Sequence, residues 1–415
     1  MPDGSSARRG WIAIAVMAAI GAPGIVMRLN GIHTEPLLDA GIFGVAILAA
    51  AFLLSWAAEA SELEISQGLA LAVIALIAVL PEYAVDAVLA WKAGADPAEA
   101  EKGLAVANMT GGNRLLIGVA WPLVFVLFYY RTKIRELVVD RHRSLELVFL
   151  AVATLYVIFI PLRHHITLLD TVLLVSLFAA YVYFTARQES EGTELVGPSE
   201  TIGRLPRPQR RVAIIGILVY SAAVIFASAE PFADGLVETG QSFGISEFFL
   251  IQWLAPLASE SPEVLVASLL AWRGRAGAGM GALISSKVNQ WTLLIGTLPL
   301  AYSISAGEFS LFGGLPLDGR QREEIFLTAA QSAFAVAVFM NLRMSAREAA
   351  ALFILFATQL FITNEMVRVW YAAAYAVLCV VLLVVHRREL RPTMRIAYNL
   401  LRGREVEAGG VPAPD

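Results

Sequence analysis

The chain has 415 residues, of which 58% are hydrophobic and 16% are charged, and its mean hydropathy is +0.67. Soluble domains are about 45–50% apolar, so this composition argues against a soluble enzyme. The formal net charge of −4 says little about partners, and a single cysteine, Cys379, excludes an intramolecular disulfide framework and a thiolate metal cluster.

Long apolar runs recur along the sequence and predict an all-α fold, a polytopic transmembrane helical bundle. Such runs have about 18 residues or more, the length that crosses a hydrocarbon core of about 30 Å. About twelve spans are expected, at residues 10–28, 37–58, 67–91, 103–129, 145–161, 166–186, 212–230, 247–272, 277–304, 325–342, 346–363 and 366–386.

The distribution of lysine and arginine between alternate loops predicts the orientation of these spans. If the N-terminus is cytoplasmic, the cytoplasmic side receives most of the basic residues, including the cluster RTKIRELVVDRHR at 131–143 and the arginines of the C-terminal tail. Because cytoplasmic loops of membrane proteins are enriched in these residues, we expect both termini in the cytoplasm.

Two related motifs, LPEYAVDAVLAW (80–91) and SPEVLVASLLAW (261–272), place carboxylates inside apolar helices 181 residues apart. Four expected spans lie between the motifs, and an even number of intervening spans means that the two helices cross the membrane in opposite directions. Inverted repeats of this kind are typical of secondary transporters. Glu82 and Glu263 each lie about 15 Å from the end of their span, near the middle of the bilayer.

The proline before each glutamate predicts an oxygen-rich site. A proline removes one helical N–H and leaves carbonyl groups without an intrahelical partner. Carbonyl and carboxylate oxygens suit hard cations such as Ca²⁺, Na⁺ or Mn²⁺, and these two helices contain no cysteine or histidine for a soft metal. The alternative is that each glutamate only pairs with Lys287 or Arg114 and contributes to packing.

A helix rich in small residues follows each motif, GLAVANMTGGNRLLIG (103–118) and GALISSKVNQWTLLIG (281–296). Small side chains allow the close approach of backbones that contacts between membrane helices require. Asn108 and Asn113 offer neutral oxygen ligands on the first of these helices. The alternative for both asparagines is hydrogen bonding between helices.

In these paired motifs the chain resembles the calcium/cation antiporter superfamily, of the sodium/calcium exchanger type. The resemblance implies that Glu82 and Glu263 are the central cation-binding carboxylates, that Asn108 is a side ligand, and that the backbone oxygens of Ala78 and Ser259 contribute. It also implies two inverted five-helix repeats with an extra helix at each end. The expected domains are an N-terminal tail and extra helix (1–36), the first repeat (37–186), a cytoplasmic linker (187–211), the second repeat (212–363), and an extra helix with a basic tail (364–415).

Several residues depart from the pattern of that superfamily. Lys287 stands where the second repeat would carry an asparagine, and Arg114 follows its counterpart, Asn113. Two additional acids, Asp86 and Glu260, lie one turn from the central glutamates on the same helix faces. The predicted site therefore contains four acids, two charge-compensating bases, and the secondary polar residues Asn113, Ser286 and Asn289.

These features predict a secondary antiporter that moves Ca²⁺ or a similar hard cation against Na⁺ or H⁺ by alternating access. A buried ammonium or guanidinium group can take the electrostatic role of a bound Na⁺. A divergent member of the fold, with its ion site partly replaced by ion pairs of Lys287 and Arg114, is the alternative; an intramembrane enzyme has less support. We expect no cofactor besides the transported cations and no nucleic acid, and the bilayer and small inorganic cations as partners; the sequence does not predict the oligomeric state.

Overall fold

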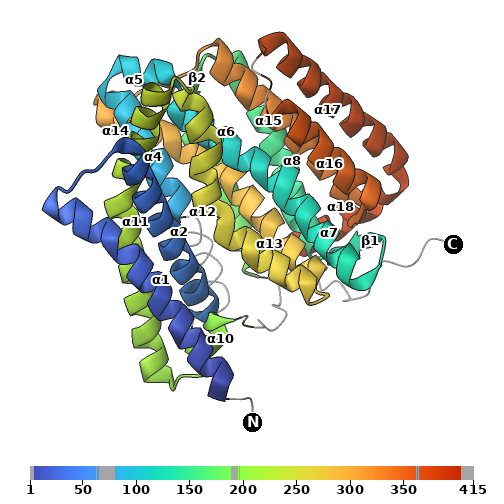
Figure 1. The fold of residues 1–415 in the computed structure, drawn as a ribbon. Helices are drawn as coiled ribbons and strands as arrows, with labels where there is room; N and C mark the ends of the chain where they lie inside the picture. Colours follow the sequence, from blue (N-terminus) through green and yellow to red (C-terminus); the bar gives the residue numbers. More distant parts are fainter. Residues whose placement is uncertain are drawn as a thin grey trace. The chain divides into compact units, whose positions relative to one another are not determined.

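The computed structural model describes residues 4–61, 63–64, 80–187, 195, 197–360, 362 and 364–402, which form two compact units (Figure 1). Unit 1 comprises Met1–Leu89 and Thr185–Pro262, and unit 2 comprises Ala90–Phe184 and Glu263–Asp415. The unit boundaries fall inside the two helices that carry the Pro-Glu motifs, α4 (Leu80–Ala95) and α12 (Glu247–Trp272).

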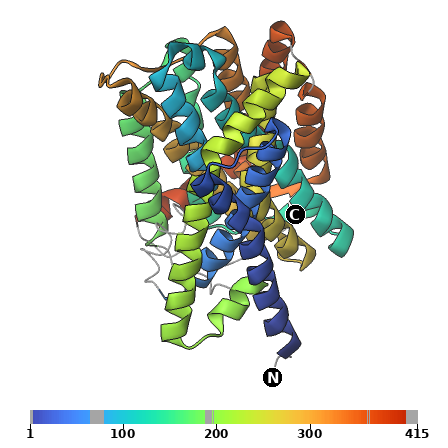
Figure 2. The same ribbon diagram turned by 60° about the vertical axis from the view of Figure 1, so that its left-hand side comes forward.

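Unit 1 is built on three long helices that lie side by side in both views (Figures 1 and 2). These are α1 (Gly4–Asn30), α2 (Pro36–Ser61) and α11 (Arg207–Phe243), and the short α10 (Pro198–Gly203) packs on α1 and α2. Glycines allow the close approach of α2 and α11, because a Cβ atom at Gly235 would lie 2.7 Å from the Ala40 backbone nitrogen. The expected linker at 187–211 thus contains α10 and the first turn of α11.

Unit 2 contains the remaining elements. In chain order they are α5 (Pro97–Lys102), α6 (Leu104–Leu115), the π-helical segment η1 (Leu116–Ala120), α7 (Trp121–Thr132), β1 (Glu136–Val138), α8 (Arg143–Val157), the 3₁₀ turn η2 (Ile160–Leu162), β2 (His165–Thr167), α9 (Leu168–Thr185), α13 (Ala276–Asn289), the π-helical segment η3 (Gln290–Leu294), α14 (Ile295–Ala306), β3 (Gly314–Pro316), α15 (Gly319–Val338), the 3₁₀ turn η4 (Phe339–Asn341), β4 (Arg343–Ser345), α16 (Ala346–Gln359), α17 (Glu365–Val385) and α18 (Arg387–Leu401). Its core includes the fully buried Trp121, Trp291 and Phe339.

The internal repeat is visible in unit 2 as a recurring order of elements. A helix, a 3₁₀ turn, a short strand and a second helix occur once as α8–η2–β2–α9 and again as α15–η4–β4–α16. The strands pair across the repeats, β1 with β4 and β2 with β3, both antiparallel. This exchange of partners is what a two-fold relation between the repeats requires. The expected domain boundaries, with repeats at 37–186 and 212–363, stay predictions.

The same local chemistry starts the last helix of each repeat, at positions 178 residues apart. The Thr167 hydroxyl and backbone N–H donate to Asp170 before α9, at 2.8 and 2.7 Å. Ser345 and Glu348 form a full capping box before α16. Such caps satisfy N–H groups that have no partner within the helix.

The prediction of an all-helical membrane bundle is confirmed, and each expected span coincides with a helical segment in the described residues. Eight of these are long and apolar enough to cross a membrane, or nine if α12, which is broken at Pro262, is one span. Three do not meet this test. The first Pro-Glu helix is described only from Leu80, α16 has 14 residues, and Lys287, Asn289 and Gln290 lower the hydropathy of α13–α14.

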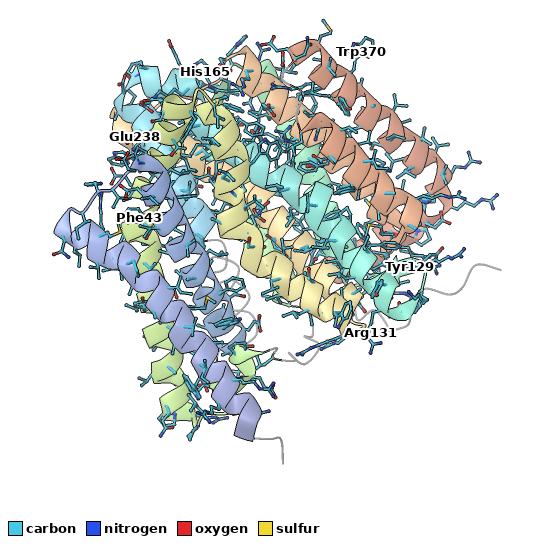
Figure 3. All side chains as sticks on the ribbon, viewed as in Figure 1. Phe43, Tyr129, Arg131, His165, Glu238 and Trp370 are labelled. Atoms are coloured by element: carbon cyan, nitrogen blue, oxygen red, sulfur yellow. The ribbon has the colours of Figure 1, made fainter. Side chains whose placement is uncertain are left out.

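Three labelled side chains show the ends and one outer face of unit 2 (Figure 3). Arg131, at the end of α7, and His165, in β2, lie at opposite ends of this unit, whereas Trp370 projects outward from α17 and is 68% exposed. A large exposed aromatic side chain on an apolar helix is typical of a surface that faces lipid.

Candidate cation-binding site

The acids of the first Pro-Glu motif lie in the first turns of α4. Glu82 and Asp86 are both buried, at 4% and 1% exposure, and they are four residues apart on one face of the helix. Ala78, whose backbone oxygen is a predicted ligand, lies outside the described residues. The paired carboxylates in the apolar helix are thus in place as predicted, and their role as cation ligands stays a prediction.

The polar residues before the second Pro-Glu motif belong to α12. Glu260 and Ser259 are buried, and the Ser259 hydroxyl donates to the backbone oxygens of Ala255 and Pro256, both at 3.3 Å. The helix is broken at Pro262, which has no N–H to donate to the carbonyl group four residues before it. The carbonyl group that loses its helical donor in this way belongs to Ala258. The role of the Ser259 backbone oxygen as a cation ligand stays a prediction.

Glu263 follows the break, and its polar neighbour on α13 is the Ser286 hydroxyl. The adjacent Ser285 lies 3.5 Å from the guanidinium of Arg143, which in turn pairs with Glu146 at 2.6 Å. Two neighbouring serines of α13 therefore face two different charged groups. Ser286 lies at Glu263, and Ser285 lies at the Arg143–Glu146 ion pair.

Lys287 is fully buried and contacts the first repeat. Its ammonium group donates to the Asn113 side-chain oxygen at 2.5 Å and lies 4.2 Å from the centre of the Trp291 ring. The Asn113 amide also donates to the Met109 backbone oxygen at 2.8 Å. Lys287 and Asn113 occupy matching places in the two repeats, and the structure brings them into contact. The first was predicted as a charge-compensating base and the second as a secondary ligand.

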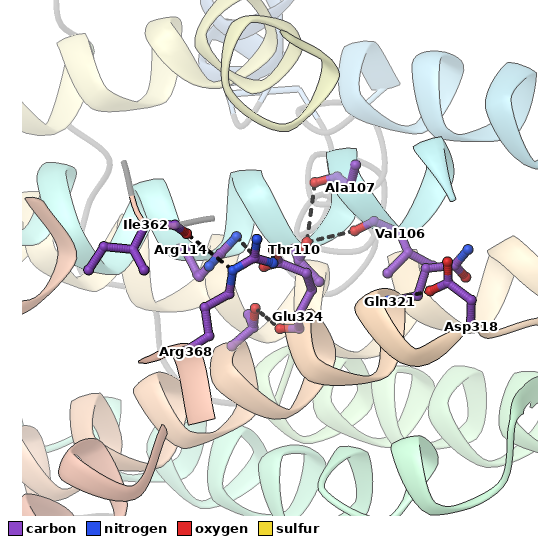
Figure 4. A network of polar contacts seen from close by, with 10 residues as sticks. Val106, Ala107, Thr110, Arg114, Asp318, Gln321, Glu324, Ile362 and Arg368 are labelled. Carbon is purple, nitrogen blue, oxygen red and sulfur yellow. Dashed lines mark hydrogen bonds and ion pairs between the residues drawn. The ribbon is translucent and has the colours of Figure 1, made fainter. Parts of the chain in front are cut away.

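Asn108, Asn289 and Arg114 are also buried, but Arg114 belongs to a different cluster. Arg114 and Arg368 both pair with Glu324, at 2.6 and 2.5 Å (Figure 4). Arg368 comes from α17 and also donates to the Ile362 backbone oxygen at 3.2 Å. This triad joins α6, α15 and α17, and its ion pair gives Arg114 a partner outside the predicted site acids.

Glu324 and Arg368 were not predicted from the sequence, although the repeat contains a signal for one of them. Glu324 lies 178 positions after Glu146, the same interval that relates the caps of α9 and α16. Both glutamates are buried on the fourth helix of their repeat. Glu146 interacts with α13 of the second repeat, and Glu324 interacts with α6 of the first.

The described residues do not gather three or more Asp, Glu, His or Cys side chains around a common point. The ligands predicted from the sequence are a few carboxylates together with amide, hydroxyl and backbone oxygens. This donor set fits a hard cation, which binds oxygen, and contains no soft ligand.

Known proteins share the sequence pattern and the fold of this chain. The family model described as sodium/calcium exchanger protein matches residues 37–187 and 213–384. A crystal structure of an H⁺/Ca²⁺ exchanger, CAX, is similar with a TM-score of 0.90 and 42% identity, covering 95% of this chain and 98% of that one. The native structure of YfkE is similar in fold, with a TM-score of 0.61 and 15% identity over 87% of this chain and 99% of that one.

A curated relative matches a shorter region. The putative antiporter CaxA of Alkalimonas amylolytica is 27% identical over 106 residues, which are 26% of this chain. The match spans about a third (33%) of the length of that relative.

Proposed function

Because the chain belongs to the sodium/calcium exchanger protein family, we propose that it is an antiporter that exchanges Ca²⁺, or a similar hard cation, for H⁺. It is an integral, multi-pass membrane protein, and its family consists of transporters of small cations. The intramembrane enzyme that the sequence left as a weak alternative has no support in this family.

The choice of H⁺ as the counter-ion rests on the similarity, over nearly the whole chain, to a solved H⁺/Ca²⁺ exchanger. The sequence adds an independent reason. Most hydroxyl ligands expected for Na⁺ before the Pro-Glu motifs are replaced, by Ala78 in the first and Glu260 in the second. A buried lysine, Lys287, also places its amino group where the second repeat would carry an asparagine.

Burial of the carboxylates gives the exchange its physical basis. An isolated carboxylate in a low-dielectric interior costs several kcal/mol, so it needs either a bound cation or a proton. In our proposal Ca²⁺ and H⁺ compete for Glu82 and Glu263, and one leaves as the other binds. Asp86, Glu260, Asn108 and the Ser259 backbone oxygen complete the proposed ligands.

A second candidate, exchange of Ca²⁺ for Na⁺, is favoured by the family description itself. A third, a divergent member that transports another ion or none, is favoured by the buried contact between Lys287 and Asn113. These candidates differ in which gradient drives cation movement, and a flux measurement separates them.

The test is Ca²⁺ uptake by the purified protein in sealed proteoliposomes with either a pH gradient or a Na⁺ gradient imposed. We expect a pH gradient that is acidic inside to drive uptake and a Na⁺ gradient at constant pH to have no effect. Replacing Glu263 by glutamine preserves the shape of the side chain but removes its charge. We expect Glu263→Gln to lower uptake more than about tenfold, since one lost charged ligand costs at least about 1.4 kcal/mol.

Glu308→Gln is the matched control, because Glu308 is an exposed acid in the loop after α14. We expect this variant to transport Ca²⁺ normally. Uptake driven by Na⁺ alone would establish the second candidate. Absence of Ca²⁺ movement under both gradients in folded protein would contradict the proposal and support the third.

A further inference from the structure

The helix α18 follows directly after the last membrane span. The apolar α17 ends at Val385 and α18 begins at Arg387, so a single residue separates them. The sequence of α18, RRELRPTMRIAYNLL, is too charged to cross a hydrocarbon core, and α18 is not among the candidate spans. A helix that starts at the end of a span without a linker is held near the level of the lipid headgroups.

One face of α18 is attached to the protein. Thr393, Ala397 and Leu400, spaced by four and three residues, are buried. The Thr393 hydroxyl donates to the Met340 backbone oxygen at 2.7 Å, and the helix packs on α8 and η4. Because this face is held against unit 2, the opposite faces of α18 point away from it.

An exposed apolar row and an exposed basic row lie next to each other on those faces. Met394 and Tyr398, one turn apart, are 45% and 48% exposed. At 100° per residue, the row Arg387, Arg391 and Arg395 follows beside them around the helix. These arginines are exposed and make no ion pair with other described residues.

We propose that α18 is an interfacial helix that binds acidic lipid headgroups through this basic row. Its apolar row, Met394 and Tyr398, enters the boundary between headgroups and acyl chains. Amphipathic helices with arginine beside apolar side chains lie in this plane of the bilayer. Each basic residue near an acidic membrane surface adds electrostatic attraction to the lipid headgroups. The guanidinium of Arg402 lies 4.5 Å from the centre of the Tyr398 ring, which keeps a further positive charge beside the apolar row.

A single fluorescent label can test this contact in the full-length protein. Cys379 is the only cysteine, so Cys379→Ser with Met394→Cys provides one labelling position within the apolar row. The labelled protein is placed in nanodiscs of phosphatidylcholine with increasing fractions of phosphatidylglycerol and a nitroxide lipid as quencher. We expect quenching to rise with the acidic fraction and to weaken in high salt, because salt screens the attraction.

Charge variants separate lipid binding from simple proximity. The triple variant carries Arg387→Gln, Arg391→Gln and Arg395→Gln together. For this variant we expect the acidic-lipid fraction that gives half-maximal quenching to rise at least about tenfold. Glu389→Gln, on the same helix, should bind acidic lipid at least as well as the parent.

Two outcomes would overturn the proposal. A label that stays in water in both lipids would leave this face free for a soluble acidic partner. Quenching that is equal in the two lipids and unchanged in the triple variant would show insertion without recognition of acidic headgroups. Neither outcome depends on transport, so this test is independent of the proposed exchange activity.

Discussion

In the interior of unit 2, the ammonium group of Lys287 lies close to the side-chain oxygen of Asn113 and to the ring of Trp291. An ammonium group at this depth is costly unless its charge is compensated by hydrogen bonds and aromatic or acidic neighbours. A fixed positive charge of this kind can do electrostatically what a bound monovalent cation would do. In the proposed exchange, Lys287 would therefore affect how many ions one transport cycle moves.

Replacing Lys287 by glutamine should change the charge that each cycle carries. If the ammonium stands in for a cation, its removal leaves a place for one more proton or Na⁺ for each Ca²⁺. We expect the pH gradient that just balances a fixed Ca²⁺ gradient to shift, and the response of the flux to membrane potential to change. The measurement is the reversal point of Ca²⁺ flux in proteoliposomes at set potentials.

The surface variant Lys133→Gln is the control, because Lys133 is exposed and should leave the reversal point unchanged. A Lys287→Gln protein that transports Ca²⁺ with the parent's reversal point would show that this charge does not replace an ion. Its folding stability is a separate readout. The Asn113 oxygen loses a charged donor, at a cost of about 1–3 kcal/mol in the free energy of unfolding.

The buried triad of Arg114, Glu324 and Arg368 joins the helices α6, α15 and α17. Removing one partner of a buried ion pair leaves an uncompensated charge and costs about 3–5 kcal/mol. Glu324→Gln leaves two guanidinium groups without their acid, whereas Arg368→Gln leaves the Arg114–Glu324 pair intact. We therefore expect Glu324→Gln to lower the unfolding free energy by about 3–5 kcal/mol, and Arg368→Gln by less.

The repeat supplies a matched control for this prediction. Glu146 occupies the equivalent place in the first repeat, but its partner Arg143 has a side chain that is 31% exposed. After Glu146→Gln, Arg143 can reach water, so we expect a smaller loss, about 1.5 kcal/mol. Denaturant unfolding in detergent micelles would measure all three variants, and a larger loss for Glu146→Gln than for Glu324→Gln would contradict the assignment.

Two glycines of α13 should respond differently to alanine. A Cβ atom at Gly279 would lie 2.6 Å from the Ala267 backbone oxygen of α12, which cannot move independently of its helix. A Cβ atom at Gly281 would meet the guanidinium of Arg143, the end of a flexible side chain. We expect Gly279→Ala to cost about 1–3 kcal/mol through overpacking and Gly281→Ala to cost less, measured by the same unfolding experiment.

The sequence predicts the helices of this fold better than the partners of its charges. Apolar runs fix where helices lie, and a Pro-Glu pair inside such a run identifies buried carboxylates because charges there are rare. Arg368, in contrast, lies in the first turn of α17, where a charged side chain usually reaches water. Only the packing of α17 against α15 turns it inward to Glu324, a contact between residues 44 positions apart.

At the scale of the whole molecule, the strand pairs determine which loops of unit 2 share a side of the membrane. β1 pairs with β4, so the loop around Glu136 and the turn before α16 lie together. β2 pairs with β3, so the loop at His165 lies with the one that precedes α15. Each pair joins loops that the alternation of spans also assigns to one side, whereas the identity of the cytoplasmic side rests on the arginine distribution.

Labelling of single cysteines in intact cells with a membrane-impermeant maleimide tests that orientation. In a Cys379→Ser background, cysteines replace the exposed Glu136 and Arg347 at one end and His165 and Ser310 at the other. With both termini in the cytoplasm, positions 165 and 310 should be labelled in intact cells, and positions 136 and 347 only after permeabilisation. The reverse pattern would place the termini outside. Labelling of 136 together with 165, but not 347, would instead contradict the strand pairing, because a β1–β4 contact cannot form between loops on opposite sides of a bilayer about 30 Å thick.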